Sequence, residues 1–343
     1  MEANEVLSDP NWLPTGFGPN KTIVFQKFEQ GGIADSTFLD SRAKGITKLK
    51  VQIAATQILP YAKGIKSETV VNELFHISHV GSTLLAKVVQ SVPASISYRE
   101  PTIFKDMTNR YYDFHSGANA FLAKEMPLLL GAIYALFQRG EFEHIFIKQT
   151  SGNLILPVKM AAKSGFSLHK REAFLYTSAK DFISHAVKSQ GAVADSVSGA
   201  PRRVGYFNRL CTFRRIELAD LKPLEKVALI WLTEMQKLNL RSNLSGVNNA
   251  INFDACIRNG GKEVMVDTLC QAFDLDEHRD TLMQSPAWAS NSKHDEPFEL
   301  ATRTQILDKN YLAHKIDIEK AITWLRDICD ENVNFATLAD KLE

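Results

Sequence analysis

The stretch Glu73-Leu-Phe-His-Ile-Ser-His-Val-Gly-Ser-Thr-Leu-Leu-Ala86 decides the fold class that we predict for this chain of 343 residues. Leu74, Phe75 and Ile77 supply an apolar, β-prone run, as expected of an inner strand of a parallel sheet. Gly81 then marks a tight turn, because a residue without a Cβ lets the backbone approach a ligand. Ser82-Thr83 suits the start of a helix, and the apolar residues of 84–89 continue at helical spacing. The stretch therefore predicts a strand, a turn and a helix in succession.

A turn of this kind can bind an anion. The first N–H groups of a helix have no partner within it, and the helix dipole places partial positive charge there. The nucleoside triphosphate version of this site needs Gly-Lys-Ser/Thr, whereas residues 79–83 read His-Val-Gly-Ser-Thr, so its lysine is missing. We expect a side chain at Gly81 to block anion binding while the chain still folds. An ordinary strand-to-helix turn without a ligand is the alternative.

The composition is that of a soluble globular protein. Hydrophobic residues make up 45% of the chain and charged residues 23%, which argues against disorder. The formal net charge is +1, so no strong overall field would attract nucleic acid or an anionic membrane, and we expect neither as a partner. The oligomeric state stays open.

The cysteines and apolar runs bear on location. The four cysteines are widely spaced, which indicates reduced thiols of a cytoplasmic protein and no metal site. No secretory signal is visible at the start. The apolar run of residues 126–137 is too short to span a bilayer and is expected to be a core helix.

Two parts of the chain differ in pattern. Residues 1–68 are expected to be an N-terminal lead-in packed on the core, with turns in residues 11–20 and short strands at 22–25 and 48–53. Residues 69–343 alternate strands with helices, which predicts an α/β domain whose parallel sheet is flanked by helices in three layers and followed by a C-terminal helix. Residues 190–222 are locally basic and expected to be irregular. The later strands are predicted at 94–98, 144–148, 173–176 and 250–254.

From about residue 70 to residue 300, the order of features resembles the sulfotransferase branch of the P-loop fold. His79, Gly81, Ser82, Thr83 and Leu84 fall on the basic, glycine, hydroxyl and apolar positions of that family's phosphosulfate-binding loop. Two departures are the histidine in place of Lys or Arg and Val80 in place of the first serine. The resemblance implies an enzyme that uses 3′-phosphoadenosine 5′-phosphosulfate (PAPS) and transfers its sulfuryl group to a hydroxyl acceptor.

The resemblance also implies roles for the turn. The backbone N–H groups of Val80, Gly81, Ser82 and Thr83 would hold the 5′-phosphate of the donor. His79 would stabilise the bridging oxygen as it leaves, if the ring is protonated, or would donate a hydrogen bond as a neutral ring. A turn histidine that faces water is the alternative.

In the family, the general base is an acidic residue at the end of the next strand, and Glu100 falls there. The alternative is that Glu100 forms a structural ion pair with Arg99 or another basic residue. Lys148 also ends a strand, and is expected to be either a second anion contact or a solvated terminus. His76 is interpreted as a packed core histidine.

The family's site for the 3′-phosphate is matched less well, because Thr177 and Ser178 stand where an arginine is expected. Lys180 and Ser184 are the nearest candidates, and Lys293 lies in a segment that resembles the basic loop closing over the cofactor. Two other functions therefore stay open. One is a nucleotide-dependent kinase or phosphotransferase, and the other is a non-catalytic binding or assembly module.

Overall fold

The computed structural model describes residues 2–66, 68–115, 122–155, 165–166, 168–211, 213–289 and 299–343. Its centre is a five-stranded parallel sheet in the order β5-β6-β4-β7-β8. All six residues of the central strand are buried, including the polar Asn72, Glu73 and His76, as expected of an inner strand with helices on both faces of its sheet. The prediction of a parallel α/β fold is confirmed. The strands are β4 (Val71–His76), β5 (Ser95–Arg99), β6 (His144–Lys148), β7 (Lys170–Tyr176) and β8 (Ala250–Asn252).

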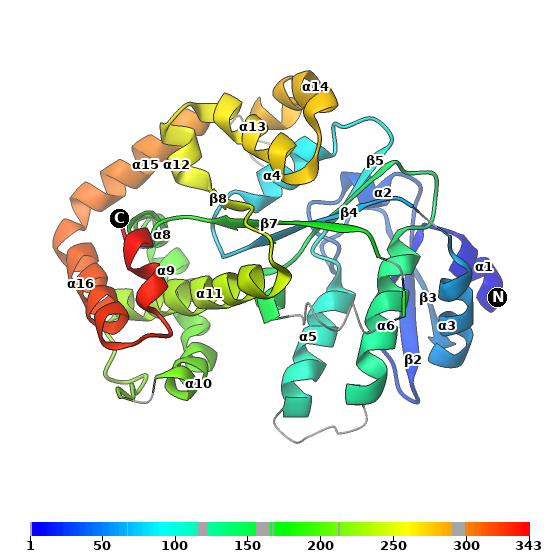
Figure 1. Ribbon diagram of the computed structural model, residues 1–343, viewed down its shortest axis with the longest axis horizontal. Helices are drawn as coiled ribbons and strands as arrows, with labels where there is room; N and C mark the ends of the chain where they lie inside the picture. The colour runs from blue at the N-terminus through cyan, green and yellow to red at the C-terminus, as the bar shows by residue number, and fades with distance from the viewer. Residues whose placement is uncertain are drawn as a thin grey trace.

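Helices cover both faces of this sheet, which gives the three predicted layers (Figure 1). One face carries α4 (Ser82–Val89) and α13 (Gly261–Phe273). The other carries α5 (Thr102–His115), α6 (Leu122–Phe137) and α11 (Pro223–Ser245). Within the described ranges, no helix combines the length and apolarity needed to cross a bilayer.

The N-terminal segment forms a second, antiparallel sheet in the order β1-β2-β3. The prediction of turns at residues 11–20 is wrong where β1 forms. Trp12 and Leu13 are buried there, and the strand pairs with β2. Apolar residues of this segment share one hydrophobic cluster with α5, α6, β5 and β6. The elements are α1 (Ala3–Ser8), β1 (Trp12–Phe17), β2 (Thr22–Phe28), α2 (Gly32–Asp35), β3 (Ile46–Ala54) and α3 (Ala55–Gly64).

The C-terminal half is mostly helical and shares a second hydrophobic cluster with β4 and α4. The irregular structure expected at residues 190–222 is wrong, since much of this segment forms α9 and α10. Pro201 lies in the first turn of α10, where no N–H partner is lost, and buried Phe207 anchors the helix. Packing against α11 outweighs the helix-weakening glycines here. The helices are α8 (Ala179–Ala186), α9 (Gln190–Ser198), α10 (Ala200–Leu210), α12 (Phe253–Arg258), α14 (Arg279–Met283), α15 (Leu300–Ala313) and α16 (Lys315–Glu331).

The last strand is shorter than predicted. The side chain of Asn252 accepts a hydrogen bond from the backbone N–H of Ala255 at 3.1 Å, which caps α12 and ends β8. Phe253 and Asp254, expected to continue the strand, are therefore the first two residues of a helix. Four short 3₁₀ helices complete the description: η1 (Ser151–Ile155), η2 (Asp276–His278), η3 (Pro286–Ala289) and η4 (Ala336–Lys341).

Candidate functional site

The turn between β4 and α4 has the left-handed backbone that its glycine suggested. Gly81 has φ 70° and His79 has φ 64°. A Cβ at Gly81 would lie 2.3 Å from Cζ of Phe253, at the start of α12. Glycine is therefore required here by the aromatic ring as well as by the backbone. A larger residue would have to displace this ring, so we expect it to destabilise the fold as well as to obstruct an anion at the turn.

The N-terminus of α4 offers unpaired N–H groups. Ser82 and Thr83 begin the helix and are buried, and within the described residues no oxygen accepts from their backbone N–H groups. The backbone N–H of Leu85 donates a hydrogen bond to the carbonyl of Gly81 at 3.2 Å, and it is the first N–H of α4 with such a partner among the described residues. Val80 is 1% exposed, so its side chain belongs to the core. The turn keeps the partial positive charge that favours an anion.

One N–H of the turn is already bound by a carboxylate. The backbone N–H of Ser78 donates to Glu234 Oε2 at 2.8 Å, and Glu234 is 1% exposed on α11. Arg203 of α10 donates to the other carboxylate oxygen, also at 2.8 Å. The hydroxyl of Ser78 lies 3.2 Å from that of Ser151 in η1. Glu234 therefore ties the start of the turn to α10 and α11, and leaves its later N–H groups available.

His79 points toward α8. Its ring centroid lies 5.8 Å from that of Phe182 and 5.0 Å from that of His185. His185 directly follows Ser184 in α8. The side chain of His79 is half-buried against α8, so His79 is not a turn histidine that fully faces water.

Arg303 is a residue of the site that the sequence did not reveal. From α15, its Nη2 donates to the backbone carbonyl of His79 at 2.9 Å, although 224 positions separate the two residues. The same guanidinium binds Asp254 through Nε at 2.6 Å and Nη2 at 3.0 Å. Asp254 also accepts from the hydroxyl of Thr177 at 2.7 Å. A permanent cation is thus fixed beside the turn.

Glu100 follows β5 with a left-handed φ of 57° and pairs with Lys148 at the end of β6. Lys148 is 2% exposed, so it is not the solvated terminus considered above. Arg99 is not the partner, since its guanidinium donates to the carbonyl of Ala34. Burial raises the pKa of Glu100, but Lys148 and His76 lower it more, and the net pKa lies below its usual value. Glu100 is therefore ionised at neutral pH.

His76 ends β4 and is 6% exposed, as the interpretation of a core histidine requires. Its Nδ1 lies 2.8 Å from the carbonyl oxygen of Ile77, while its Nε2 is buried with no partner in the described part of the chain. Burial, followed by the charge of Lys148, lowers its pKa to about 4. The ring is neutral at pH 7, with Nδ1 as the donor.

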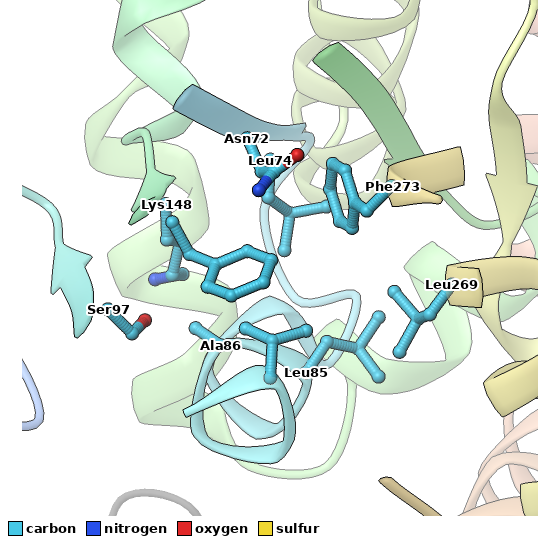
Figure 2. Close-up of a pocket in the computed structure, with 10 residues that line it drawn as sticks. Asn72, Leu74, Leu85, Ala86, Ser97, Lys148, Leu269 and Phe273 are labelled. Atoms are coloured by element: carbon cyan, nitrogen blue, oxygen red, sulfur yellow. The ribbon is translucent and has the colours of Figure 1, made fainter. Parts of the chain in front are cut away.

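Two cavities adjoin these residues. A cavity of about 850 Å³ is lined by Glu100 and by residues of α5, η1, α10 and α11. The second, of about 10 Å³, is drawn in Figure 2 and lies between the sheet and α4 and α13. Its size suits one water molecule, and the polar atoms of Asn72 and Ser97 lining it are buried without partners among the described residues. Only the larger cavity has room for a substrate.

Of the residues expected at the 3′-phosphate, Lys180 and Ser184 lie one turn apart on α8. Lys180 Nζ lies 4.0 Å from a carboxylate oxygen of Glu343 and 4.3 Å from the ring centroid of Tyr311. Ser184 is 1% exposed, and its hydroxyl is buried with no partner in the described ranges. Lys293 lies outside the described residues. Their roles stay predictions.

One group of possible metal ligands occurs among the described residues. Side-chain ligand atoms of His144, Glu277 and His278 lie within 4.8 Å of one another. His144 begins β6, whereas the turn follows the end of the parallel strand β4. This group therefore lies at the amino-terminal ends of the strands, and the turn lies at their carboxyl ends.

No protein-family model and no curated protein matches the chain. Among solved structures, the sulfotransferase domain from the curacin biosynthetic pathway is 11% identical with a TM-score of 0.38, over 71% of this chain and 97% of that one. The sulfotransferase domain from the Synechococcus PCC 7002 olefin synthase is 13% identical with a TM-score of 0.40, over 71% of this chain and 88% of that one. The function of the chain is therefore inferred from its own residues.

Proposed function

We propose that the protein is a sulfotransferase-like enzyme that binds PAPS and transfers its sulfuryl group to a hydroxyl acceptor. The observation that carries this proposal is the turn of residues 78–81. It joins the central parallel strand to α4 and leaves the N–H groups of Ser82 and Thr83 without acceptors among the described residues. Such a helix start binds the phosphate of a nucleotide. The lysine required for a triphosphate is absent from this turn.

Each part of the turn has a role in this proposal. The N–H groups of Val80 to Thr83 hold the 5′-phosphate, and His79 donates to the bridging oxygen. Arg303, paired with Asp254, places a permanently charged guanidinium beside the turn. Arg303 donates a hydrogen bond to the His79 carbonyl at 2.9 Å, so it lies beside the turn. It therefore provides a cation there although the turn itself has no lysine.

Glu100 is the proposed general base. It lines the 850 Å³ cavity and is ionised at neutral pH, so it can accept a proton from an acceptor hydroxyl bound there. Lys148 orients its carboxylate through the ion pair. By analogy with phosphoryl transfer, the other residues contribute mainly by positioning the reactants and balancing charge.

The 3′-phosphate contacts are the least developed part of the site. We keep Lys180, Ser184 and Lys293 as candidates. A phosphate at Lys180 competes with Glu343 for the ammonium group, because their charged atoms lie 4.0 Å apart. It also has to reach Ser184 at a buried position in α8.

A second candidate function is a non-catalytic nucleotide-binding or assembly module. Thr177 stands where the family's arginine is expected, and its hydroxyl donates to Asp254, which in turn holds Arg303. These residues satisfy one another, as they would in a site that has lost a ligand contact.

Calorimetric titration with adenosine 3′,5′-bisphosphate tests the proposal. We expect binding that does not need magnesium and that exceeds binding of adenosine 5′-monophosphate, because only the bisphosphate carries the 3′-phosphate. Binding of ATP only with magnesium would support a kinase instead. Absence of binding by each of these adenine nucleotides would reject the enzyme proposal and favour the assembly module.

A further inference from the structure

The 850 Å³ cavity is strongly basic. Its volume falls in the range of small-molecule sites. Its walls come from helices that are far apart in the sequence, namely α5, α10 and α11, together with η1. Glu100 is the one carboxylate that lines it in the described part of the chain. Five cationic side chains line it: Lys105, Arg202, Arg203, Arg209 and Lys237.

Protein carboxylates balance only part of this charge. Glu100 is paired with Lys148, and Glu234 is paired with Arg203. No carboxylate of the described residues forms an ion pair with Lys105, Arg202 or Arg209. Like charges gathered in one concave site repel one another, and such an arrangement is typical of a site that receives an anion.

The pKa of Lys237 is affected by the positive charges around it. Burial lowers the pKa of Lys237 most, and the charges of Arg203 and Arg209 lower it further, against the opposing charge of Glu234, to about 8. Two lining residues also carry buried polar atoms with no partner among the described residues, Arg203 Nε and Thr150 Oγ1. Buried donors of this kind are normally satisfied, and oxygens of a bound ligand would do so.

We propose that this cavity binds the acceptor, and that the acceptor is a small alcohol carrying a phosphate or carboxylate group of its own. This inference rests on the proposed function. The arginines of α10 offer planar guanidinium groups that bind such groups through two parallel hydrogen bonds. The acceptor's anionic group lies against α10, and its hydroxyl reaches Glu100.

The cavity adjoins the turn, but lies on the other side of it from the proposed 3′-phosphate residues. The hydroxyl of Ser78 in the turn contacts that of Ser151 on the cavity wall at 3.2 Å, so the two sites adjoin. Glu100 follows β5, on the β6 side of the central strand, whereas α8 with Lys180 and Ser184 follows β7 on the other side. Donor and acceptor therefore approach the turn from opposite sides.

The reaction balances with these groups. The acceptor oxygen forms a new bond to sulfur while its proton passes to the carboxylate of Glu100. The bond between sulfur and the bridging oxygen breaks, and both of its electrons leave with adenosine 3′,5′-bisphosphate. The product is a sulfate ester that still carries the anionic group held by α10.

The test compares charged and neutral alcohols by calorimetry, with the protein saturated by adenosine 3′,5′-bisphosphate. The pairs are glycerol 3-phosphate with glycerol, and 4-(hydroxymethyl)benzoate with benzyl alcohol. We expect at least one anionic alcohol to bind about tenfold or more tightly than its neutral partner, the gain of about one charge-assisted contact. The double variant Arg202→Ala/Arg209→Ala should remove that preference, whereas Arg202→Lys/Arg209→Lys should retain part of it.

A matched control removes two charges elsewhere. Arg214→Ala/Arg215→Ala changes the net charge equally, but neither residue lines the cavity, and Arg214 pairs with Glu331 at 3.6 Å. This control should keep the preference for the anionic alcohol. Arg202 and Arg209 are exposed, so their replacement should leave the melting temperature close to that of the wild type.

Three results would overturn the inference. The first is equal binding of the anionic and neutral alcohols in both pairs, and the second is equal weakening by the two alanine pairs. The third is an anionic alcohol that binds the protein without nucleotide but not the nucleotide-saturated protein, which would assign the cavity to the donor. The proposed function fails separately. If adenosine 3′,5′-bisphosphate does not bind, but an anionic alcohol binds in a manner that depends on Arg202 and Arg209, the cavity remains an anion site and its role as an acceptor site is rejected.

Discussion

The ring of Phe253 packs directly on Gly81, so that a Cβ at position 81 would lie 2.3 Å from Cζ of the ring. We expect Gly81→Ala to lower the free energy of unfolding by more than the roughly 1 kcal/mol that a left-handed alanine costs. Gly246 is a matched control, because it has the same φ of 70° but a Cβ placed there would have no atom within 4 Å. Urea unfolding of both variants measures the difference.

A double-mutant cycle identifies the cause. In a Phe253→Ala background, Gly81→Ala should cost no more than Gly246→Ala does in the wild type, because the overlapping ring is gone. If Gly81→Ala and Gly246→Ala are equally destabilising in the wild type, the close approach of Phe253 does not constrain the turn.

Glu100→Gln separates catalysis from structure. If Glu100 is the base, turnover should fall by roughly 10²–10⁴-fold while affinity for adenosine 3′,5′-bisphosphate stays the same. The melting temperature should also fall, since buried Lys148 loses its counter-charge. Turnover equal to that of the wild type in the folded variant would reject the catalytic role.

Lys148→Met provides the complementary change. Lys148 lowers the pKa of Glu100, so its removal should raise that pKa and move the acidic limb of the pH–rate profile to higher pH. The neutral methionine keeps most of the buried volume. An unchanged acidic limb would show that the ionisation of Glu100 does not control the rate.

Arg303→Lys tests the cation beside the turn. The lysine keeps the charge but cannot bind Asp254 and the His79 carbonyl with one planar group, as the arginine does. We expect affinity for adenosine 3′,5′-bisphosphate to fall by about tenfold. Arg279→Lys, a control in α14 that changes an arginine paired with Asp267, should leave this affinity unchanged. Equal affinities in all three proteins would remove Arg303 from the site.

His76 should make stability depend on pH. Its pKa is lowered from about 6.5 to about 4 on folding, first by burial and then by Lys148, so the unfolded chain binds more protons between these values. Stability should therefore fall as the pH drops from 6.5 toward 4, by up to about 1.4 kcal/mol per pH unit from this residue. His76→Gln should reduce that slope, and the exposed control His314→Gln should not. Parallel slopes in the wild type and His76→Gln would contradict the assignment.

The sequence predicted the elements whose signal is local. The apolar run of β4, the glycine after it and the helical spacing of α4 all lie within residues 73–86, and the structure has strand, turn and helix there. Strand β6 was predicted with its observed limits, His144–Lys148. Packing on α11 stabilises α10, and pairing with β2 stabilises β1. Both segments contain turn-forming residues, and for that reason the prediction from sequence was wrong there.

The polar contacts of the site were beyond the sequence. Glu73 stands in the middle of the central strand, where it contacts Tyr134 of α6, Gln149 after β6 and Lys170 of β7. Glu100 could be matched to a family position, but Lys148 as its partner emerged only from the neighbouring strand ends.

The sequence by itself determined the parallel α/β fold and the position of the turn, because hydrophobic periodicity and backbone preference act over a few neighbouring residues. The tertiary structure alone decided that Arg303 lies at the turn and that α10 brings its arginines to the cavity of Glu100. Charges interact through space, so their partners depend on where distant segments of the chain meet once the core has packed.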